Sequence, residues 1–409
     1  MTKTGDRAKR ALFITYNGVD ESIFQSQCLP YLKGLASGGH VITLVSYQRD
    51  PARAEAYSKQ LEGLGIRWYR LKYHKAPRFI MTCWDFALGA AVSLYLVLRH
   101  GIDIIHARAT HAAVIGMPAA MLPGRKLIFD MRGLDSEEYV DGGLMARGSV
   151  LHKMTLGFER MILRRADAVV LLSGKAMELL KDRNMDRLIE GKPVSVIPCA
   201  TDLGLFRCAK KQARPVDSPV RFVYTGSVGT WYMLDEMLKF VKAAAVRFGV
   251  NMTVFSIYTQ SGIEYVKQRV SESGLEGIVS VGFVDHDRVP EFLRESDAGL
   301  CFIRPVSSKR ASSPTKVGEY LACGLPVIIT GAIGDAAGLL ADKRVGIVID
   351  DFSELHYNKA LTELEGLIKD PALAERCRRA AEEYFSLDKA VEEYGLIYGK
   401  LKRPRERTK

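Results

Sequence analysis

The sequence contains few cysteines, and their spacing argues against the sites that cysteine usually builds. Seven cysteines are scattered over 409 residues, and no two of them form a Cys-x-x-Cys pair. Scattered cysteines of odd number are typical of reduced core residues in a cytoplasmic protein, not of a disulfide framework or a zinc site. The eight histidines form no His-Glu-x-x-His pattern either, so the sequence predicts no metal site.

Two further signals are absent near the N-terminus. The apolar stretch at residues 11–16 is too short for a signal peptide and suits a first β-strand. The loop that follows contains Asn17 and Gly18 but no Gly-x-Gly-x-x-Gly fingerprint, which argues against a dinucleotide site. A glycine-bearing loop at the carboxyl end of a strand is still a place where ligands bind in parallel sheets.

Acidic residues are sparse in the first half of the chain. Residues 1–200 carry 28 Lys and Arg against 19 Asp and Glu, a surplus of nine, whereas the remainder carries 30 against 28. A basic half suggests an anionic partner. No nucleic-acid-binding motif accompanies the charge, so an acidic membrane surface or a phosphorylated lipid acceptor fits better than nucleic acid. Charge that serves only solubility is the alternative.

Strand-like and helix-like patterns alternate along the whole sequence. The length predicts two domains of about 200 residues each. The alternation predicts an α/β fold with parallel, doubly wound sheets, and it restarts after a linker near residues 207–219. Within the first domain we expect one helix over residues 22–39 and a polar loop over residues 134–143.

The most apolar run, residues 79–98, is long enough to cross a membrane. However, Thr82, Asp85, Gly89 and Ser93 recur at helical spacing and form a polar, small-residue stripe. A helix packed on a core or dipped into a membrane face explains this stripe better than a transmembrane span does.

Two consecutive strands in the first half end in ionisable residues. One ends in His106 and Arg108, and the next ends in Asp130 and Arg132. Active sites gather at this edge of a parallel sheet, so these side chains are candidate ligands of a substrate. The alternative is that His106 is a structural hydrogen-bonding group.

Residues 312–331, SSPTKVGEYLACGLPVIITG, predict a loop, a short helix, a tight turn and a buried strand. We expect Ser313 to cap the helix, and Gly324 to end it. The free amides at the helix start form a phosphate site, and Lys316 in the first turn adds a positive charge. Glu319 can accept two hydroxyl hydrogen bonds from a sugar ring. The alternative is an ordinary βα unit with a Lys316–Glu319 pair on its surface.

The stretch SSPTKVGEYLACGLPVI resembles the donor-site motif of GT-B glycosyltransferases of the family-4 type. The likeness covers nearly the whole chain, is also strong at residues 194–206, and is weaker in the N-terminal domain. In that family the helix amides and a basic residue hold the diphosphate of a nucleotide-sugar, and the glutamate that matches Glu319 holds the ribose. Segments around His106 and Asp130 resemble its acceptor domain, where the histidine lies beside the transferred sugar. The sequence departs from the family at Ala311, where many members carry a second glutamate near the donor sugar.

A glycine turn after the linker also resembles the donor site. Residues 226–229 match the family's turn near the donor phosphates, but Trp231 and Tyr232 follow where an arginine and a lysine are usual. Basic residues close to the donor motif, Lys309 and Arg310 among them, are candidates to supply the missing charge. The resemblance implies the following donor-binding residues: Gly226, Ser227, Lys309, Arg310, Ser313, Thr315, Lys316 and Glu319. His106 and Glu319 are the candidate catalytic residues, and the candidate acceptor-binding residues are Asn17, Gly18, Arg108, Asp130 and Arg132.

The second half of the sequence contains one acidic triplet that resembles a metal-binding motif. Asp285-His286-Asp287 has the Asp-x-Asp form that binds Mn²⁺ or Mg²⁺ in GT-A glycosyltransferases. An acidic loop at the start of a helix explains it better.

The resemblance implies a GT-B fold, in which two Rossmann-like domains face a cleft and a C-terminal helix crosses back to the first domain. We expect an acceptor-binding domain at 1–205, a nucleotide-sugar-binding domain at 206–385, and a crossing helix with a basic tail at 386–409. The implied activity is transfer of a sugar, with retention of anomeric configuration and without a metal or cofactor, from a UDP- or GDP-linked donor to a lipid-linked or glycan acceptor.

The implied setting is polysaccharide or glycolipid synthesis, in the cytoplasm or at the inner face of the plasma membrane, with an anionic membrane surface as a candidate partner and no nucleic acid. Two alternatives are a catalytically silent nucleotide-sugar-binding subunit and a nucleotide-sugar epimerase.

Overall fold

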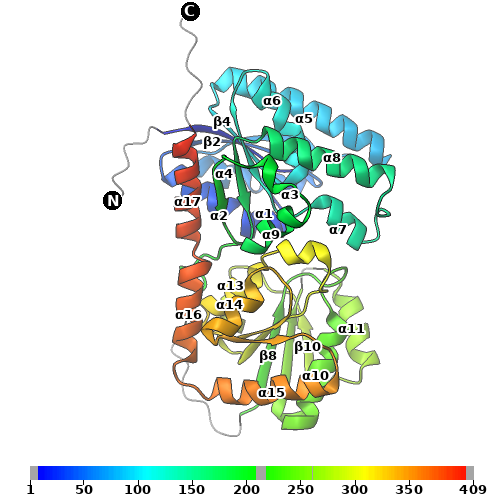
Figure 1. Cartoon of the computed structure of the whole chain (residues 1–409). Helices are drawn as coiled ribbons and strands as arrows, with labels where there is room; N and C mark the ends of the chain where they lie inside the picture. The colour runs from blue at the N-terminus through cyan, green and yellow to red at the C-terminus, as the bar shows by residue number, and fades with distance from the viewer. Residues whose placement is uncertain (1–7, 209–217, 260, 402–409) are drawn as a thin grey trace, which may run out of the picture. The chain divides into compact units, whose positions relative to one another are not determined.

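A computed structural model gives the fold of residues 8–208, 218–259 and 261–401. Most of the expected linker and the basic tail at 402–409 lie outside these residues. The chain forms two compact units: unit 1 comprises Met1–Pro198 and Leu387–Lys409, and unit 2 comprises Cys199–Ser386 (Figure 1). Both are α/β and all their strand pairs are parallel, so the expected doubly wound fold is confirmed.

Unit 1 is built on a seven-stranded sheet of order β3-β2-β1-β4-β5-β6-β7. Its strands are β1 Arg10–Ile14, β2 Val41–Gln48, β3 Arg67–Lys72, β4 Ile104–Arg108, β5 Lys126–Asp130, β6 Ala168–Leu171 and β7 Val194–Val196. Its helices are α1 Ser22–Gln27, α2 Leu29–Ser37, α3 Pro51–Glu55, α4 Ser58–Gly63, α5 Arg78–His100, α6 Ala109–Met121, α7 Asp135–Asp141, α8 Val150–Arg165, α9 Gly174–Asp182, the 3₁₀ segment η1 Asp186–Leu188 and α17 Leu387–Lys400. Strands β1, β4 and β5 are buried along almost their whole length, as expected for a sheet covered on both faces.

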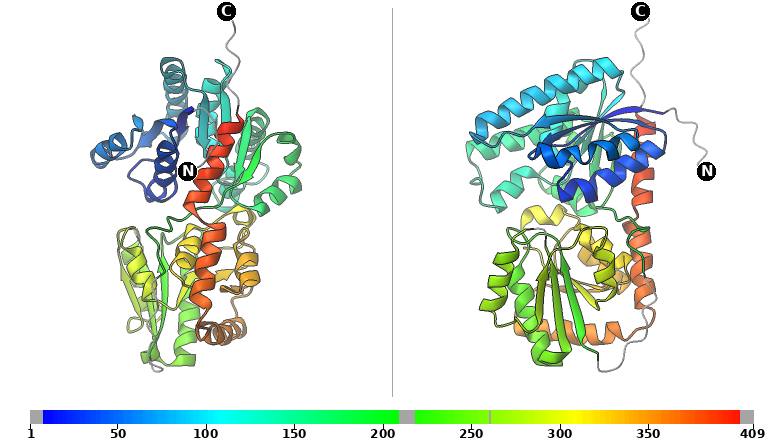
Figure 2. Two further views of the ribbon diagram at one scale, coloured as in Figure 1. Left: turned by 90° about the vertical axis from the view of Figure 1, so that its left-hand side faces the viewer. Right: turned by 180° about the vertical axis from the view of Figure 1, so that it is seen from behind.

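Unit 2 is built on a six-stranded sheet of order β10-β9-β8-β11-β12-β13, with helices on both faces (Figure 2). Its strands are β8 Val220–Thr225, β9 Thr253–Tyr258, β10 Val279–Gly282, β11 Ala298–Cys301, β12 Val327–Thr330 and β13 Gly346–Ile349. Its helices are α10 Leu234–Phe248, η2 Val250–Met252, α11 Ile263–Glu272, α12 Val289–Arg294, η3 Ser307–Ala311, α13 Thr315–Ala322, α14 Ala336–Lys343, α15 Glu354–Ile368 and α16 Leu373–Tyr384. Two clusters of buried apolar side chains, lying mostly on opposite faces of the sheet, form its core.

Two expectations about local structure in unit 1 were wrong. The helix expected over residues 22–39 is two helices, α1 and α2, that meet at Cys28. Pro30 explains the break, because it has no amide to donate to the carbonyl of Ser26 and its ring would collide with that carbonyl, whereas the first turn of α2 tolerates a proline. The polar loop expected over 134–143 contains helix α7, whose first turn holds Asp135, Glu137 and Glu138 and so complements the helix dipole.

The long apolar helix α5 packs on unit 1 through the stripe that the sequence indicated. Asp85 and Ser93 are fully buried, and the backbone carbonyl of Asp85 accepts a 2.6 Å hydrogen bond from the hydroxyl of Tyr47. Gly89 faces the same tyrosine, and a side chain there would collide with its hydroxyl group. The helix is long and apolar enough to cross a membrane by length and composition. Its polar stripe, however, packs against Tyr47 of the sheet.

The C-terminal helix α17 is part of unit 1, although its sequence follows unit 2. Gly34 on α2 has no side chain, which leaves room for Val391 of α17. The Lys9 ammonium donates a 3.2 Å hydrogen bond to the carbonyl of Leu401, just after the helix. The expected return of the last helix to the first domain is therefore confirmed.

Candidate functional site

Each sheet has one point at which the strand order reverses. In unit 1 it lies between β1 and β4, and in unit 2 it lies between β8 and β11. Chains that leave neighbouring strands in opposite directions open a crevice at the carboxyl ends, which is where ligands bind in such sheets. The residues that follow β1, β4, β8 and β11 are therefore candidate ligand-binding residues.

In unit 2 a glycine turn and a lysine meet at this edge. Gly226, directly after β8, has a φ of 122°, a backbone conformation that favours glycine. A side chain at this position would lie 3.5 Å from the ammonium of Lys316, so the lysine stands directly beside the turn. Lys316 is in the first turn of α13 and is only 6% exposed. A positive charge, an open glycine turn and a helix start thus come together.

Three aromatic residues hold the basic groups of this site. The Lys316 ammonium lies 3.8 Å from the ring centroid of Tyr232 and 5.0 Å from that of Tyr224. The Lys309 ammonium lies 4.2 Å from the ring centroid of Trp231. The negative faces of the rings attract the ammonium groups without neutralising them. Trp231 and Tyr232 stand where the family pattern has basic residues. They therefore position Lys309 of η3 and Lys316 of α13.

The start of α13 differs from the expected cap. The helix begins at Thr315 with Pro314 as its N-cap, and no side chain caps it. Ser313 does not cap the helix, because its hydroxyl accepts a 3.1 Å hydrogen bond from the amide of Cys199. The helix ends as expected, since Gly324 follows it with a φ of 78°. The amides of the first turn thus have no side-chain cap and can bind an anion.

Glu319 has a partner that the sequence analysis did not identify. Its carboxylate lies 2.9 Å from Nε2 of His286, the middle residue of the acidic triplet. Burial alone would lower the pKa of His286, but the hydrogen bond and charge of Glu319 outweigh it and raise the pKa above its ordinary value. Glu319 is 7% exposed and does not lie on a solvated helix face. The alternative of a surface pair between Lys316 and Glu319 is therefore wrong, because Lys316 contacts aromatic rings and Glu319 contacts a histidine.

The other predicted donor-binding residues are more exposed than Lys316 and Glu319. Ser227 is exposed, and its backbone carbonyl accepts a hydrogen bond from the Tyr224 hydroxyl. Arg310 is exposed on η3, and Thr315 is the half-buried first residue of α13. Their contacts with a donor stay predictions.

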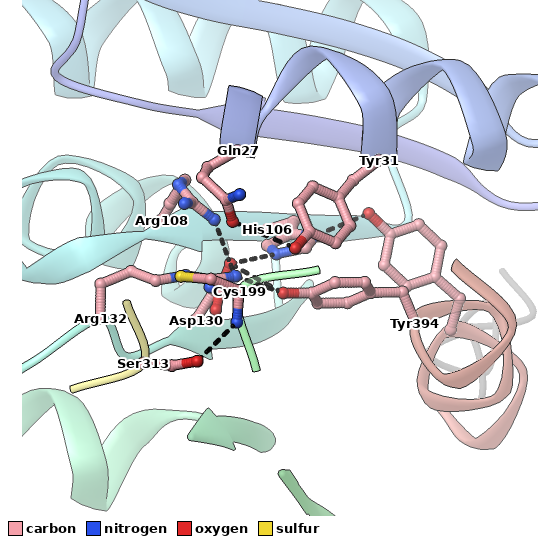
Figure 3. A network of polar contacts seen from close by, with 10 residues as sticks. Gln27, Tyr31, His106, Arg108, Asp130, Arg132, Cys199, Ser313 and Tyr394 are labelled. Atoms are coloured by element: carbon pink, nitrogen blue, oxygen red, sulfur yellow. Dashed lines mark hydrogen bonds and ion pairs between the residues drawn. The ribbon is translucent and has the colours of Figure 1, made fainter. Parts of the chain in front are cut away.

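In unit 1 the predicted residues at the ends of β4 and β5 come together around one carboxylate (Figure 3). Oδ2 of Asp130 lies 2.7 Å from the Arg132 guanidinium and 3.3 Å from that of Arg108. It also accepts a 3.1 Å hydrogen bond from the Tyr394 hydroxyl of α17. Burial alone would raise the pKa of Asp130, but Arg132, His106 and Arg108 outweigh it and hold the pKa well below its usual range. Asp130 is therefore a buried anion that joins β4, β5 and the C-terminal helix.

His106 belongs to this buried network. Its Nδ1 lies 2.9 Å from the Tyr398 hydroxyl, and its Nε2 lies 3.4 Å from Asp130. The side chain is 1% exposed, and this burial lowers its pKa despite the opposing effect of Asp130. A neutral imidazole that is hydrogen-bonded to α17 and lies beside Asp130 agrees with the alternative that His106 is a structural hydrogen-bonding group, and its contact with a transferred sugar stays a prediction.

Asn17 and Gly18 form a separate local arrangement after β1. The side-chain amide of Asn17 donates a 2.8 Å hydrogen bond to Glu21, and the backbone amide of Gly18 donates one of 3.0 Å to the same carboxylate. The loop is thus held by Glu21 at the start of α1. It lies at the reversal point of the unit 1 sheet, but it has no direct link to the Asp130 network among the contacts described.

Several residues at these sites were missed by sequence reasoning. Tyr394 and Tyr398 are four positions apart on α17, so their shared face was a readable signal for a buried contact. His286 was passed over within an acidic triplet, whereas Trp231 and Tyr232 were seen only as departures from a pattern. Within residues 8–208, 218–259 and 261–401, no group of three or more His, Cys, Asp or Glu side chains is placed to hold a metal ion.

Family comparisons match both units. The family described as Glycosyl transferase 4-like domain matches residues 26–200, and the family described as Glycosyl transferases group 1 matches residues 219–365. Together the two matches cover more than half of the chain. Comparison with curated protein sequences gives no match.

Solved glycosyltransferases share the fold over almost the full chain. Sucrose-phosphate synthase from Thermosynechococcus elongatus has a TM-score of 0.73 at 18% identity, and the likeness covers 96% of this chain and 99% of that one. A glycosyltransferase from Rickettsia africae ESF-5 has a TM-score of 0.71 at 14% identity, covering 97% and 99%. Anabaena HepE in complex with UDP-glucose has a TM-score of 0.68 at 16% identity, covering 95% and 99%. These structures share the fold, the family matches cover both units, and the chain therefore belongs to the GT-B glycosyltransferases of the family-4 type.

Proposed function

We propose that the protein transfers a sugar from a nucleotide-sugar bound by unit 2 to a lipid-linked or glycan acceptor, with retention of anomeric configuration. The observation that carries the proposal is the position of Lys316, held by two tyrosine rings beside Gly226 at the start of α13. A buried ammonium next to uncapped helix amides suits a diphosphate. Glu319, three residues further along the same helix, then faces the ribose hydroxyls.

The chemistry requires that charge on a leaving diphosphate be stabilised without a metal. The amides of α13, Lys316 and Lys309 supply fixed positive charge for the nucleoside diphosphate as the bond from the sugar to its phosphate oxygen breaks. The acceptor hydroxyl oxygen forms the new bond to the same face of the sugar carbon, and its proton passes to the departing phosphate oxygen. This front-face route needs no carboxylate nucleophile, and Ala311 supplies none.

We propose UDP- or GDP-linked sugars as donors. The likeness to HepE, which was crystallised with UDP and with UDP-glucose, supports the uridine class first. The basic balance of the first half of the sequence favours an anionic acceptor, such as a phosphorylated lipid carrier used in polysaccharide or glycolipid synthesis at the inner face of the plasma membrane.

A thermal-shift panel of nucleoside diphosphates and nucleotide-sugars tests the donor proposal. A ligand present at 100 times its dissociation constant should add about 2.7 kcal/mol to the stability of the unit that binds it. Lys316→Ala should abolish most of that shift, whereas Lys242→Ala, an exposed lysine on α10, should leave it unchanged. A panel without any shift, in the wild type at millimolar ligand, contradicts the proposal.

A nucleotide-sugar-binding subunit without transferase activity is the second candidate. The buried methyl group of Ala311 favours it, because many family members place a carboxylate near the donor sugar there. Release of nucleoside diphosphate from a donor bound by the purified protein separates the two functions. Binding without any release, with a panel of acceptors present, supports the silent subunit.

His106 is proposed as the group beside the transferred sugar, and its burial makes a paired test necessary. His106→Gln and Tyr398→Phe both remove the bond between β4 and α17. If His106 contacts the sugar, His106→Gln should lower kcat at least about tenfold more than Tyr398→Phe. Equal losses of stability with unchanged kcat in both variants would assign His106 a structural role only.

A further inference from the structure

The outer surface of unit 1 contains an apolar stripe that the glycosyltransferase site does not use. Helix α5 carries its polar stripe inward, and its opposite side exposes Ile80, Trp84, Ala87, Ala91, Tyr95 and Leu98. These positions recur every three or four residues, so they form one continuous line along the helix. Trp84 is 55% exposed and Leu98 is 63% exposed, which is unusual for side chains of this size. We call this line the α5 stripe.

Neighbouring helices extend the apolar surface. Helices α5, α6 and α8 pack side by side over one face of the unit 1 sheet (Figure 1). Leu122 directly follows α6 and is 73% exposed, and Val150 at the start of α8 is 75% exposed. Met154 and Phe158 follow on α8 at intervals of four and are also exposed. An exposed apolar surface spread over three adjacent helices marks a binding face and not scattered surface residues.

The charges on these helices identify the kind of partner. The only carboxylates in α5, α6 and α8 are Asp85 and Glu159, and both are buried. Among the side chains of the three helices whose burial the structure describes, the exposed charged ones are all basic, and they are Arg99, Lys153, Arg160, Arg164 and Arg165. A surface of apolar and aromatic groups with basic residues and without exposed acidic ones is complementary to an anionic lipid surface. Trp84 and Tyr95 are the residue types that settle at the boundary of headgroups and acyl chains.

We propose that the outer face of the α5–α6–α8 layer docks unit 1 on the surface of an anionic membrane, with α5 lying in the interface and not across it. A span would expose Asp85, whose carboxylate binds the ring of His74 at 2.6 Å and the hydroxyl of Tyr16 at 3.3 Å. Removing those partners leaves a buried charge unpaired in hydrocarbon. Docking through the α5 stripe keeps the hydrogen bonds of Asp85 with His74 and Tyr16.

Docking deepens the proposed function, on which this step rests, by naming a lipid-linked acceptor. Helix α5 begins just after β3, at the carboxyl edge of the unit 1 sheet, and Asp85 contacts Tyr16 at the end of β1. The membrane-facing helix is therefore attached to the edge where an acceptor is expected. A phosphorylated lipid would reach that edge without leaving the surface.

Vesicle flotation tests docking independently of enzyme activity. The wild-type protein should float with vesicles that contain phosphatidylglycerol and stay in solution with phosphatidylcholine alone, and salt should weaken binding. The stripe variant Trp84→Ser/Tyr95→Ser/Leu98→Ser should lower the bound fraction at least about tenfold. Its matched control, Tyr265→Ser/Leu355→Ser, removes exposed apolar side chains of unit 2 and should float like the wild type.

A charge variant keeps the test valid if the stripe variant misfolds. Lys153→Glu/Arg160→Glu/Arg164→Glu should also lower the bound fraction at least about tenfold, because each basic residue near such a surface strengthens binding about fivefold. Lys33→Glu/Lys242→Glu, at exposed positions outside the three helices, is its control. Equal flotation with both vesicle types, or flotation that survives both variants, overturns the proposal.

Two other results would assign the face to something else. A dimer in solution that the stripe variant dissociates, without flotation of the wild type, overturns docking in favour of a second copy of the chain. Extraction from membranes by detergent alone overturns it in favour of a span. Failure of the nucleotide tests with flotation intact removes the transferase proposal and leaves the docking surface in place.

Discussion

Lys316 and Glu319 lie three positions apart on α13, yet their environments give them different chemical tasks. The aromatic rings of Tyr224 and Tyr232 hold the Lys316 ammonium, and no carboxylate among the described residues compensates its charge. Glu319 is instead paired with His286, and this bond must be exchanged for ribose hydroxyls if a nucleotide binds there. An uncompensated cation is ready for an anion, whereas a paired carboxylate must first release its partner.

We expect this difference to separate the two residues in calorimetry. Lys316→Ala should weaken binding of a nucleoside diphosphate at least about tenfold and spare the free nucleoside, because only the diphosphate needs the ammonium. Glu319→Gln should weaken both ligands about 10- to 100-fold, since the amide loses the charge and one acceptor oxygen. Equal losses for both ligands in both variants would contradict this division of roles.

The bond from His286 to Glu319 predicts that nucleotide affinity depends on pH. The pKa of His286 is raised above its ordinary value, so the charged imidazole holds Glu319 at low pH and releases it as pH rises through the raised pKa. Asp287 and Asp202 favour the same charged form. Nucleoside affinity should therefore increase from acidic to alkaline pH across that window.

His286→Ala tests this competition. The variant should bind nucleoside more tightly than the wild type below the histidine pKa, and its affinity should be nearly flat with pH. Titration calorimetry at several pH values measures both effects. Weaker binding by the variant at every pH would instead make His286 a direct contact of the ligand.

Among the secondary-structure elements, α17 is attached to unit 1 by buried polar contacts. The Tyr394 hydroxyl donates to Asp130 and accepts a 2.6 Å hydrogen bond from Arg132, so one atom joins the helix to a buried ion pair. Buried hydrogen bonds to charged groups are more costly to lose than neutral ones. The polar contact therefore fixes the position of a helix whose apolar packing alone could tolerate a shift.

Tyr394→Phe should destabilise unit 1 by about 1–3 kcal/mol, because it leaves part of a buried charge network without its partner. Tyr265→Phe, at an exposed position of α11, is the matched control and should change stability by less than about 0.5 kcal/mol. Urea denaturation of the full chain measures both. A loss as small as that of the control would show that apolar contacts, such as that of Val391 beside Gly34, hold the helix by themselves.

At the scale of the whole molecule, two compact units share one chain, and each has its own core. Unit 1 is completed by the last helix, so both ends of the sequence contribute to it. Two units of this size can unfold separately, in which case one unfolding temperature does not describe the protein.

We expect scanning calorimetry to resolve two transitions, of which only the unit 2 transition responds to a nucleoside diphosphate. The ligand binds folded unit 2, so at 100 times the dissociation constant that transition should gain about 2.7 kcal/mol of stability. Lys316→Ala should remove the shift of the unit 2 transition that the nucleoside diphosphate causes. A shift of both transitions together would show that the units unfold as one cooperative body.

Much of this architecture was predictable from the sequence because its signals are local. The alternation of apolar strands and helices predicted two doubly wound sheets, and the small, polar stripe from Thr82 to Ser93 favoured a packed or interfacial helix over a transmembrane span. Gly324 predicted the end of α13, because a left-handed turn favours glycine. The break at Pro30 and the short helix α7 were missed, since propensity over a few residues is weak evidence.

The tertiary structure decided which side chains meet. Nothing in the local sequence around Glu319 places His286 beside it, because the two residues come from different segments that the sheet brings together. The same holds for Trp231 with Lys309, and for His106 with Tyr398, whose positions differ by 292. Sequence periodicity therefore determined the sheets, the helices and their buried faces. The partners of each charge depend on distant segments, and only packing in three dimensions selected them.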